Sequence, residues 1–399
     1  MLKAQFVDFV KLANFFFKTL GLELCEICDG RRRSWQSYVI FYIMFINMNL
    51  NQVSEIVFVT KALYTGENFI EATMIGACSG FSFVSITKMI YICWKREELL
   101  LFMQQLMDLF PKTYIEQQNY ALLDYLKKCG RITISFAVLN MVLILTYDMS
   151  AAMQFLIADR WLGISDVGKQ LPFLMWIPWN YEDHWSFYVL YASQSFSAYC
   201  SSAGQLASDL LLFASAIQVI MHYDYVAKTI EEYEVKGSSE KQEEQDMLFL
   251  SYIIEYHEKV LSLSECMNNV FGAPLLLNFM SSSFVICFLG FQMTIDVPTE
   301  MLVPVFIFLL VSMTQVFLVC HFGQTLIDSV GTFKAQSVYN QNWHNAEVRY
   351  KKMLVLIAER AQKPALMKAT NFVCISLTTM TEVCISYKFF TLLRTMFSE

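Results

Sequence analysis

A single carboxylate lies within the last long apolar run of the chain, at Glu382. An unpaired charge in membrane hydrocarbon costs several kcal/mol, so this side chain should face water or a polar partner. If the run lines a pore, the carboxylate attracts cations. Alternatively, it faces the protein interior in a protonated or hydrogen-bonded state. The sequence supports both alternatives equally.

Residue types that usually bind metals or catalyse reactions are spread along the chain. Five histidines lie far apart: His184, His222, His257, His321 and His344. Cys25 and Cys28 form one CxxC pair, but no second pair or histidine lies near them. Lys88, Asp148 and Asp209 also appear scattered and close to the ends of apolar runs. We therefore expect no metal, no cofactor, no catalytic residue and no enzymatic activity.

The composition indicates a membrane protein. Of 399 residues, 56% are hydrophobic and only 16% are charged. Seven apolar runs are each long enough to cross about 30 Å of hydrocarbon at about 1.5 Å per residue. They cover residues 36–60, 70–94, 132–153, 185–221, 267–293, 301–326 and 371–397. We expect an all-α polytopic membrane protein with seven transmembrane helices.

The basic residues lie almost entirely on one side of these runs. The N-terminal arm and the gaps after the second, fourth and sixth runs hold 23 of the 29 lysines and arginines, whereas the alternate gaps hold three. The positive-inside rule therefore predicts a cytoplasmic N terminus and an extracellular C terminus. A G-protein-coupled receptor has the opposite orientation. The net charge of −7 argues against a nucleic-acid partner.

This plan divides the chain into four segments. Residues 1–35 form a cytoplasmic arm, residues 36–326 hold six membrane helices, residues 327–370 form a cytoplasmic helical region, and residues 371–399 hold the seventh helix and a short external tail. Six apolar residues of the arm could form one face of a helix lying at the membrane interface: Phe6, Phe9, Val10, Phe16, Phe17 and Leu20.

An amphipathic pattern occupies the gap between the sixth and seventh runs. Its large apolar residues recur at steps of three and four: Tyr339, Trp343, Ala346, Tyr350, Met353, Leu354 and Ile357. One interpretation is a helix that packs against the chain's own inner helices. The other is a subunit interface, where Trp and Tyr are enriched, and its residues would be Tyr339, Trp343, Tyr350, Leu354 and Ile357.

The carboxyl-terminal third also contains a characteristic order of residues. It begins with Tyr339 and Trp343, continues with Arg360, Pro364 and Ser376-Leu377 with Thr379, and ends in Ser386-Tyr387-Lys388-Phe389-Phe390-Thr391-Leu392-Leu393. This order, together with the inverted seven-helix plan, resembles the insect odorant receptor family. Two positions depart from the family pattern: Lys388 replaces a frequent Ser, and Ser386 stands near a glutamine of some members.

The resemblance implies an odorant-gated, non-selective cation channel in the plasma membrane of a sensory neuron dendrite. Four subunits would surround a central pore lined by the last helix and meet in a cytoplasmic anchor region. The gap at residues 222–266 is short, which is typical of a tuned subunit that assembles with the odorant receptor co-receptor as a heterotetramer. Its other partners would be a small volatile odorant, permeant cations and membrane lipid. A gustatory receptor channel is the nearest alternative, and a G-protein-coupled receptor is a more distant one.

The resemblance also implies where ligand and ions would be met. The apolar gate would be Val383, with Ser386 and Tyr387 beside it and Glu382 in the pore, since a ring of apolar side chains gates by dewetting. The odorant would bind among the second to sixth helices, where the residues that fit are Cys78, Phe81, Asn140, Tyr147, Tyr199, Ser202, Phe291 and Thr294. Ordinary packing is the alternative for each of them, because pockets are mostly apolar, as cores are.

Overall fold

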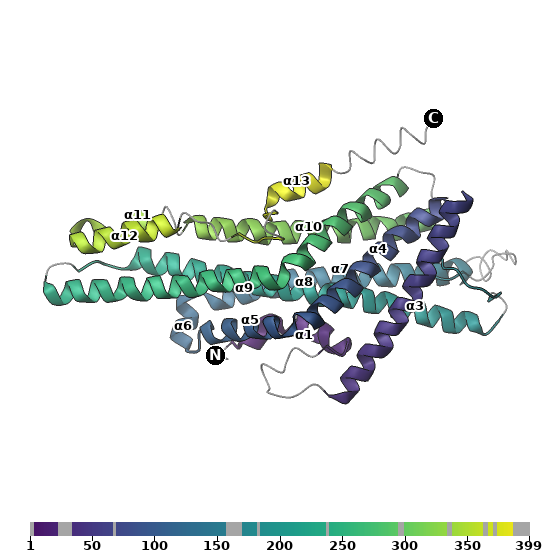
Figure 1. Cartoon of the computed structure of the whole chain (residues 1–399), viewed down its shortest axis with the longest axis horizontal. Helices are drawn as coiled ribbons and strands as arrows, with labels where there is room; N and C mark the ends of the chain where they lie inside the picture. The colour runs from purple at the N-terminus through teal and green to yellow at the C-terminus, as the bar shows by residue number, and fades with distance from the viewer. Residues whose placement is uncertain are drawn as a thin grey trace.

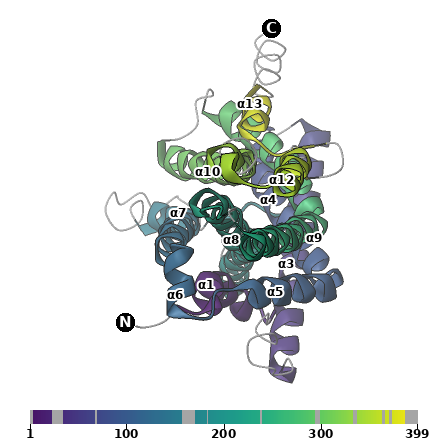
Figure 2. The same cartoon turned by 90° about the vertical axis from the view of Figure 1, so that its left-hand side faces the viewer.

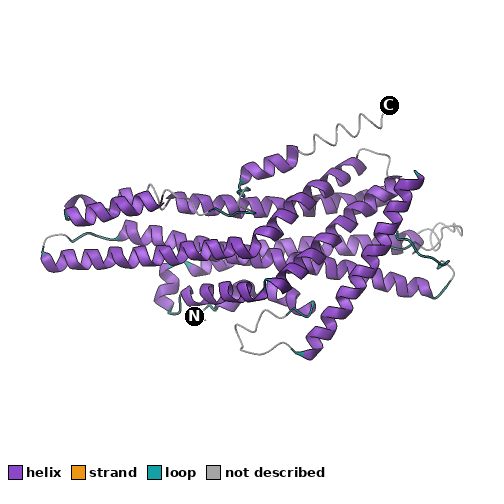
Figure 3. Cartoon of the chain, in the orientation of Figure 1, coloured by secondary structure: helices purple, strands orange, loops and turns teal. Residues whose placement is uncertain are grey.

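The protein is described by a computed structural model over residues 4–22, 34–66, 69–156, 170–181, 184–236, 239–293, 299–332, 337–361, 366–369 and 373–385. Within these ranges the chain is almost wholly helical, with one isolated antiparallel bridge between Lys368 and Cys374 (Figure 3). The long helices form an elongated bundle (Figure 1). The expected all-helical fold is confirmed.

Six long helices correspond to the first six predicted spans. They are α3 (Trp35–Thr65), α4 (Phe69–Trp94), α7 (Leu122–Leu156), α8 (Ser186–Glu232), α9 (Glu240–Gln292) and α10 (Thr299–Thr332). In the part of the chain that the structure describes, all of these except α3 are both long and apolar enough to cross a membrane. α3 has 31 residues, but several Asn, Gln and Glu side chains make it less apolar.

The seventh span is represented by α13 (Leu377–Ile385). It begins later than the residue 371 expected from the apolar run, because residues 373–375 pair with residues 367–369 and are not helical. The Ala369 amide donates to the Val373 carbonyl at 2.9 Å, and the Ile375 amide donates to the Met367 carbonyl at 2.8 Å. These bonds satisfy backbone groups that a helix would have used, so the helix starts after them.

Shorter helices complete the described structure. The first of them in the chain is α1 (Phe6–Thr19), which comes before α3. Between α4 and α7 come α5 (Arg96–Leu109) and α6 (Tyr114–Asn119). After α10 come α11 (Val338–Asn340), a 3-10 turn (Trp343–Asn345) and α12 (Val348–Ala361). α12 and α10 lie above the long α8 and α9 in Figure 1. The amphipathic stretch that starts at Tyr339 is therefore divided into three elements and does not form one continuous helix.

α8 is the centre of the bundle, and every residue from Cys200 to Tyr223 is buried. It contacts α1, α3, α4, α7, α9 and α10, which surround it in the end-on view of Figure 2. Its many Ser, Ala and Gly residues let neighbouring helices approach closely. At Gly204 an added Cβ would clash with Ser85 Oγ of α4 at 2.4 Å and would lie tightly against Met89 at 3.3 Å. The small residue therefore sets the distance between α4 and α8.

The apolar face of α1 packs on this central helix. All six arm residues that the sequence placed on one helix face are buried: Phe6, Phe9, Val10, Phe16, Phe17 and Leu20. The Phe6 and Phe9 rings also meet the Phe110 ring edge-on, with centroids 5.9 and 6.2 Å apart. The periodicity correctly identified the apolar face, and the protein's own core covers that face.

Candidate ligand-binding site

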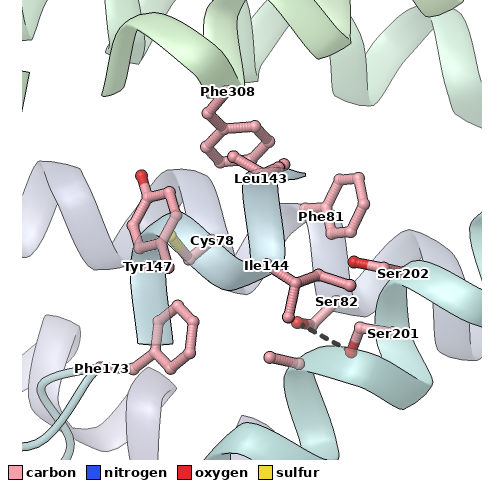
Figure 4. A pocket seen from close by; sticks show the side chains of 11 residues that line it. Cys78, Phe81, Ser82, Leu143, Ile144, Tyr147, Phe173, Ser201, Ser202 and Phe308 are labelled. Atoms are coloured by element: carbon pink, nitrogen blue, oxygen red, sulfur yellow. Dashed lines mark hydrogen bonds between the residues drawn. The ribbon is translucent and has the colours of Figure 1, made fainter. Parts of the chain in front are cut away.

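A small cavity lies where α4, α7, α8 and α10 meet. Its volume is about 50 Å³, and its lining residues are Cys78, Phe81, Ser82, Leu143, Ile144, Tyr147, Phe173, Ala198, Ser201, Ser202 and Phe308. The lining is mostly apolar, with two aromatic clusters and a few hydroxyl groups (Figure 4). Ser201 donates a hydrogen bond to Ser82 at 3.2 Å, which joins α8 to α4 at the cavity wall.

Aromatic rings form two connected walls of the cavity. The Tyr147 ring stacks on Phe173 with centroids 5.7 Å apart, and it meets Phe308 edge-on at 6.1 Å. Phe308 in turn meets Phe81 edge-on at 5.6 Å. Such pairs hold ring orientations through their quadrupoles. Phe308 therefore couples α10 to both α4 and α7, as the view in Figure 4 shows.

A segment outside the helices closes one side of the cavity. Phe173 belongs to the connection before α8, and the buried side chain of Gln194 on α8 holds its backbone. The Phe173 amide donates to the Gln194 Oε1 atom at 3.1 Å, and Gln194 Nε2 donates to the Phe173 carbonyl at 2.7 Å. One amide side chain thus satisfies both backbone groups of Phe173 and fixes the ring over the cavity.

The cavity brings together four of the residues expected at a ligand site: Cys78, Phe81, Tyr147 and Ser202. The other expected residues lie elsewhere. Asn140 is buried and donates to the Phe136 carbonyl of its own helix at 2.9 Å. Tyr199 packs against the main core, and Phe291 is half-buried at the end of α9. Thr294 is outside the described residues.

Most lining residues that sequence reasoning missed lie one helical turn from those it found. Ser82 is four residues after Cys78, Leu143 is four before Tyr147, and Ala198 is four before Ser202. Residues four apart share a helix face, so this spacing was an available signal. Phe173 had no such signal, because it lies in an irregular connection with no periodicity.

Beside the cavity lies a buried ion pair that the sequence did not reveal. Lys88 Nζ donates to Asp209 Oδ1 at 2.7 Å, and the two side chains are only 0% and 2% exposed. The expectation that Lys88 and Asp209 are scattered near span ends is wrong, since α4 and α8 place them in direct contact. Three amides complete the arrangement: Gln205, Asn278 and Gln315.

These five residues form one network across four helices. Gln205 Oε1 accepts from Lys88 at 2.7 Å, so the cation has two oxygen partners. Asp209 accepts from Asn278 of α9 at 3.1 Å and from Gln315 of α10 at 2.5 Å. A buried charge is tolerated only when it is paired and hydrogen-bonded, and both conditions hold here. We call this set the Lys88–Asp209 network.

The network is connected directly to the cavity wall. Gln205 Nε2 donates to the carbonyl of Phe81, a cavity residue, at 3.2 Å. On α8, Asp209 follows Ser202 by seven residues, which is about two helical turns. A shift of the Phe81 backbone would therefore move Gln205. Through Lys88, which Gln205 and Asp209 share, it would also affect the hydrogen bonds that α9 and α10 make with Asp209.

Comparison with known proteins decides the family. The model of the family described as 7tm Odorant receptor matches residues 68–385. The chain belongs to this family. Odorant receptor 85b of Drosophila melanogaster is 42% identical over 395 residues, covering 98% of this chain and 99% of that protein. Odorant receptor 85c of the same species is 40% identical over 393 residues, covering 98% of this chain and 100% of that protein.

A solved structure has the same fold as the receptor. The insect olfactory receptor OR5 from Machilis hrabei in complex with eugenol matches with a TM-score of 0.77, covering 98% of this chain and 100% of that chain at 15% identity. The resemblance seen in the carboxyl-terminal third is thus confirmed, and the seven-helix membrane fold with it. The receptor is therefore assigned to the odorant receptor family in preference to the gustatory receptor and G-protein-coupled receptor alternatives.

The residues expected at the pore lie in the carboxyl-terminal part of the receptor, of which the structure describes residues 373–385. Glu382 is exposed on α13, and Val383 follows it in the same helix. The Val383 side chain, and Ser386 and Tyr387 entirely, lie outside the described part of the chain. α13 packs on α10 and α9. Close to its start, an added Cβ on Gly323 of α10 would collide with the Ile375 carbonyl.

The residues expected at a subunit interface divide into two groups. Tyr350, Leu354 and Ile357 are buried within the receptor's own core, as the packing interpretation predicts. Tyr339 is 75% exposed, and Trp343 is half-buried, with its ring stacked on His344 at 4.2 Å. The exposed apolar residues of α12 lie on its other side: Val348, Val355 and Leu356.

Proposed function

We propose that the receptor is a tuned subunit of an odorant-gated, non-selective cation channel. It binds a small volatile molecule in the aromatic cavity among α4, α7, α8 and α10, and it opens a central pore lined by the helix that begins at Leu377. The observation that carries the proposal is the mostly apolar, aromatic-lined cavity with few hydroxyl groups, in a chain of the odorant receptor family. A receptor of the same fold was solved in complex with eugenol.

Burial alone supplies sufficient affinity for such a ligand. A volatile of about ten heavy atoms needs about 0.8 kcal/mol per atom to reach micromolar affinity, which is within the range of small ligands. Apolar contact with the rings of Phe81, Tyr147 and Phe308 provides this mainly by dispersion and dehydration. The hydroxyl groups of Ser82, Ser201 and Ser202 would orient a ligand that carries one polar atom.

The cavity must enlarge to admit this ligand. Its 50 Å³ has room for only a few water molecules, since each needs about 10–15 Å³. The rings can move more readily than the buried α8 backbone, so we expect Phe308, Phe173 or Tyr147 to yield. Because Phe308 belongs to α10, which packs on α13, expansion of the cavity would displace the helix that bears Glu382.

Gating then depends on a difference in affinity between two states. A ligand that binds the open and closed forms equally well shifts neither population, however tightly it binds. We assign the small cavity of this structure to the closed form. A ligand that fits only the enlarged cavity therefore stabilises the state in which α10 and α13 have moved, which we assign to the open pore.

We also propose that the receptor assembles with the co-receptor as a heterotetramer in the plasma membrane of the sensory neuron dendrite, with its N terminus in the cytoplasm. The distribution of lysine and arginine supports this orientation. The outer face of α13 and the exposed residues Tyr339, Val348 and Val355 are available to other subunits. These surfaces are where we expect pore and anchor contacts.

Co-expression with the co-receptor tests the proposal. We expect membrane currents carried by cations when a panel of volatile molecules is applied, with or without inhibitors of G-protein signalling. The control is the co-receptor expressed alone. Absence of any current, with surface delivery confirmed by an epitope tag, would refute the channel function, as would currents that vanish when G proteins are inhibited.

Replacement of Glu382 by Gln tests its place in the pore. If the carboxylate faces the permeation path, loss of its charge should lower single-channel conductance about twofold or more and weaken selectivity for cations over anions, because a local attraction for cations is removed. Single-channel recording and reversal potentials measure both. Identical conductance and selectivity in the variant would place the carboxylate outside the pore.

A further inference from the structure

A second hollow lies on the outside of the bundle, between α7 and α10. Its volume is about 380 Å³, and its lining residues are Lys128, Arg131, Ile132, Ser135, Phe136, Leu139, Thr314 and Leu318. α7 and α10 pack against each other beside α8 (Figure 2). We call this hollow the α7–α10 groove. It is separate from the ligand cavity, which begins one helical turn farther along α7 at Leu143.

One end of the groove is cationic. Lys128 and Arg131 lie one helical turn apart at its mouth, and none of its eight lining residues is acidic. Lys128 also lies near His321 of α10. Lys128 is half-buried and Arg131 is exposed, so the charged groups of both side chains can reach a ligand at the mouth. Charge complementarity therefore favours an anionic group at this end.

The rest of the groove is apolar and has the length of one membrane leaflet. From Lys128 to Leu139 the helix rises about 17 Å, which is close to half of the roughly 30 Å hydrocarbon thickness. Ile132, Phe136 and Leu318 line this length. Thr314 lies near the deep end of the groove. Its hydroxyl donates to the Leu310 carbonyl of its own helix at 2.7 Å, so this donor needs no hydrogen-bond partner from a ligand.

The surface around the groove is suited to hydrocarbon. Ile134 and Val138 of α7 are 57% and 56% exposed, and Phe317 of α10 is 43% exposed. Exposed large apolar residues on helices that cross a membrane face lipid, and basic pockets between such helices attract anionic headgroups. The groove therefore opens toward the bilayer with its cationic mouth at one membrane surface.

We propose that the α7–α10 groove is a binding site for an anionic phospholipid, with the lipid phosphate on Lys128 and Arg131 and one acyl chain along Ile132, Phe136 and Leu318. In the orientation proposed above, the lipid belongs to the cytoplasmic leaflet. A single acyl chain matches the length and the apolar lining of the groove, and the phosphate matches the two cations. The site requires neither odorant binding nor a current.

Native mass spectrometry of the full-length receptor tests the site. The protein is equilibrated in micelles with equal amounts of phosphatidylserine and phosphatidylcholine, and the bound lipids are counted. We expect phosphatidylserine to be retained about tenfold more than phosphatidylcholine, and we expect Lys128→Gln combined with Arg131→Gln to abolish that preference. Lys127→Gln is the matched control, because Lys127 is an exposed neighbour that does not line the groove.

A second pair of variants tests the apolar part of the groove. Ser135→Trp should fill the groove and lower retention of both lipids, whereas Ile134→Trp, on the adjacent exposed position, should not. Equal loss from Lys127→Gln and from the double variant would show general surface attraction and overturn the site. Unchanged retention in Ser135→Trp would also overturn it. If Ser135→Trp instead releases a co-assembled subunit, the groove is a protein contact.

Discussion

Replacing Lys88 with methionine is expected to destabilise the folded receptor by about 3–5 kcal/mol. Lys88 and Asp209 are fully buried, so removal of the cation leaves the Asp209 carboxylate with only the amides of Asn278 and Gln315 as partners. A buried charge without a counter-charge carries most of its desolvation cost. The expected result is a large fall in the midpoint of thermal unfolding in detergent and in the yield of folded protein.

Two further variants decide whether loss of the buried ion pair causes the fall in stability of Lys88→Met. Lys95→Met removes a partly exposed ion pair with Glu98, at 2.5 Å, and should leave the unfolding midpoint nearly unchanged, because solvent screens this pair. Asp209→Leu added to Lys88→Met removes both charges and should recover part of the lost stability. Equal unfolding midpoints for Lys88→Met and Lys95→Met would contradict the account of the buried network.

Replacing Ala198 with phenylalanine should raise the odorant concentration for half-maximal current by about a hundredfold or more. Ala198 lines the cavity from α8 and is half-buried, so the added ring occupies space that the ligand needs. If it displaces about four ligand atoms, at about 0.8 kcal/mol each, the loss is about 3 kcal/mol, or roughly a hundredfold in affinity. Concentration–response curves with co-expressed co-receptor measure the shift.

The matched control for this variant is Ala192→Phe. Ala192 lies on the same helix, but it is exposed and does not line the cavity. It should leave the concentration–response curve unchanged at equal surface expression. A normal curve for Ala198→Phe would show that the odorant binds elsewhere, and the cavity among α4, α7, α8 and α10 would lose its assigned role.

Hydropathy and periodicity predicted the helices well because they depend on local composition. The first six apolar runs all became long helices, and α1 has the buried face that its phenylalanines predict. Periodicity does not say what covers a face, however, so α8 could not be anticipated as the cover of α1. The start of α13 was also missed, because the Lys368–Cys374 bridge interrupts an apolar run without changing its hydropathy.

The site was harder to predict where it depends on residues distant in sequence. Lys88 and Asp209 are 121 positions apart, and each alone resembles an isolated charge in an apolar run. Only the packing of α4 on α8 brings them together. Cys78, Phe81, Tyr147 and Ser202 were found because they lie on regular helices. Phe173 was not, since the Gln194 side chain that holds it over the cavity is a tertiary contact.

The length of α8 has a mechanical consequence. Its 47 residues form one uninterrupted helix of about 70 Å, which begins beyond the candidate ligand cavity and ends at Glu232. Near that far end, Glu231 accepts a hydrogen bond from Asn340 of α11 at 3.0 Å. In a rigid helix of this length, a small rotation produces a large displacement at the end. A tilt of the whole helix by a few degrees would therefore displace Glu231, and with it the segment that precedes α12, by several ångströms.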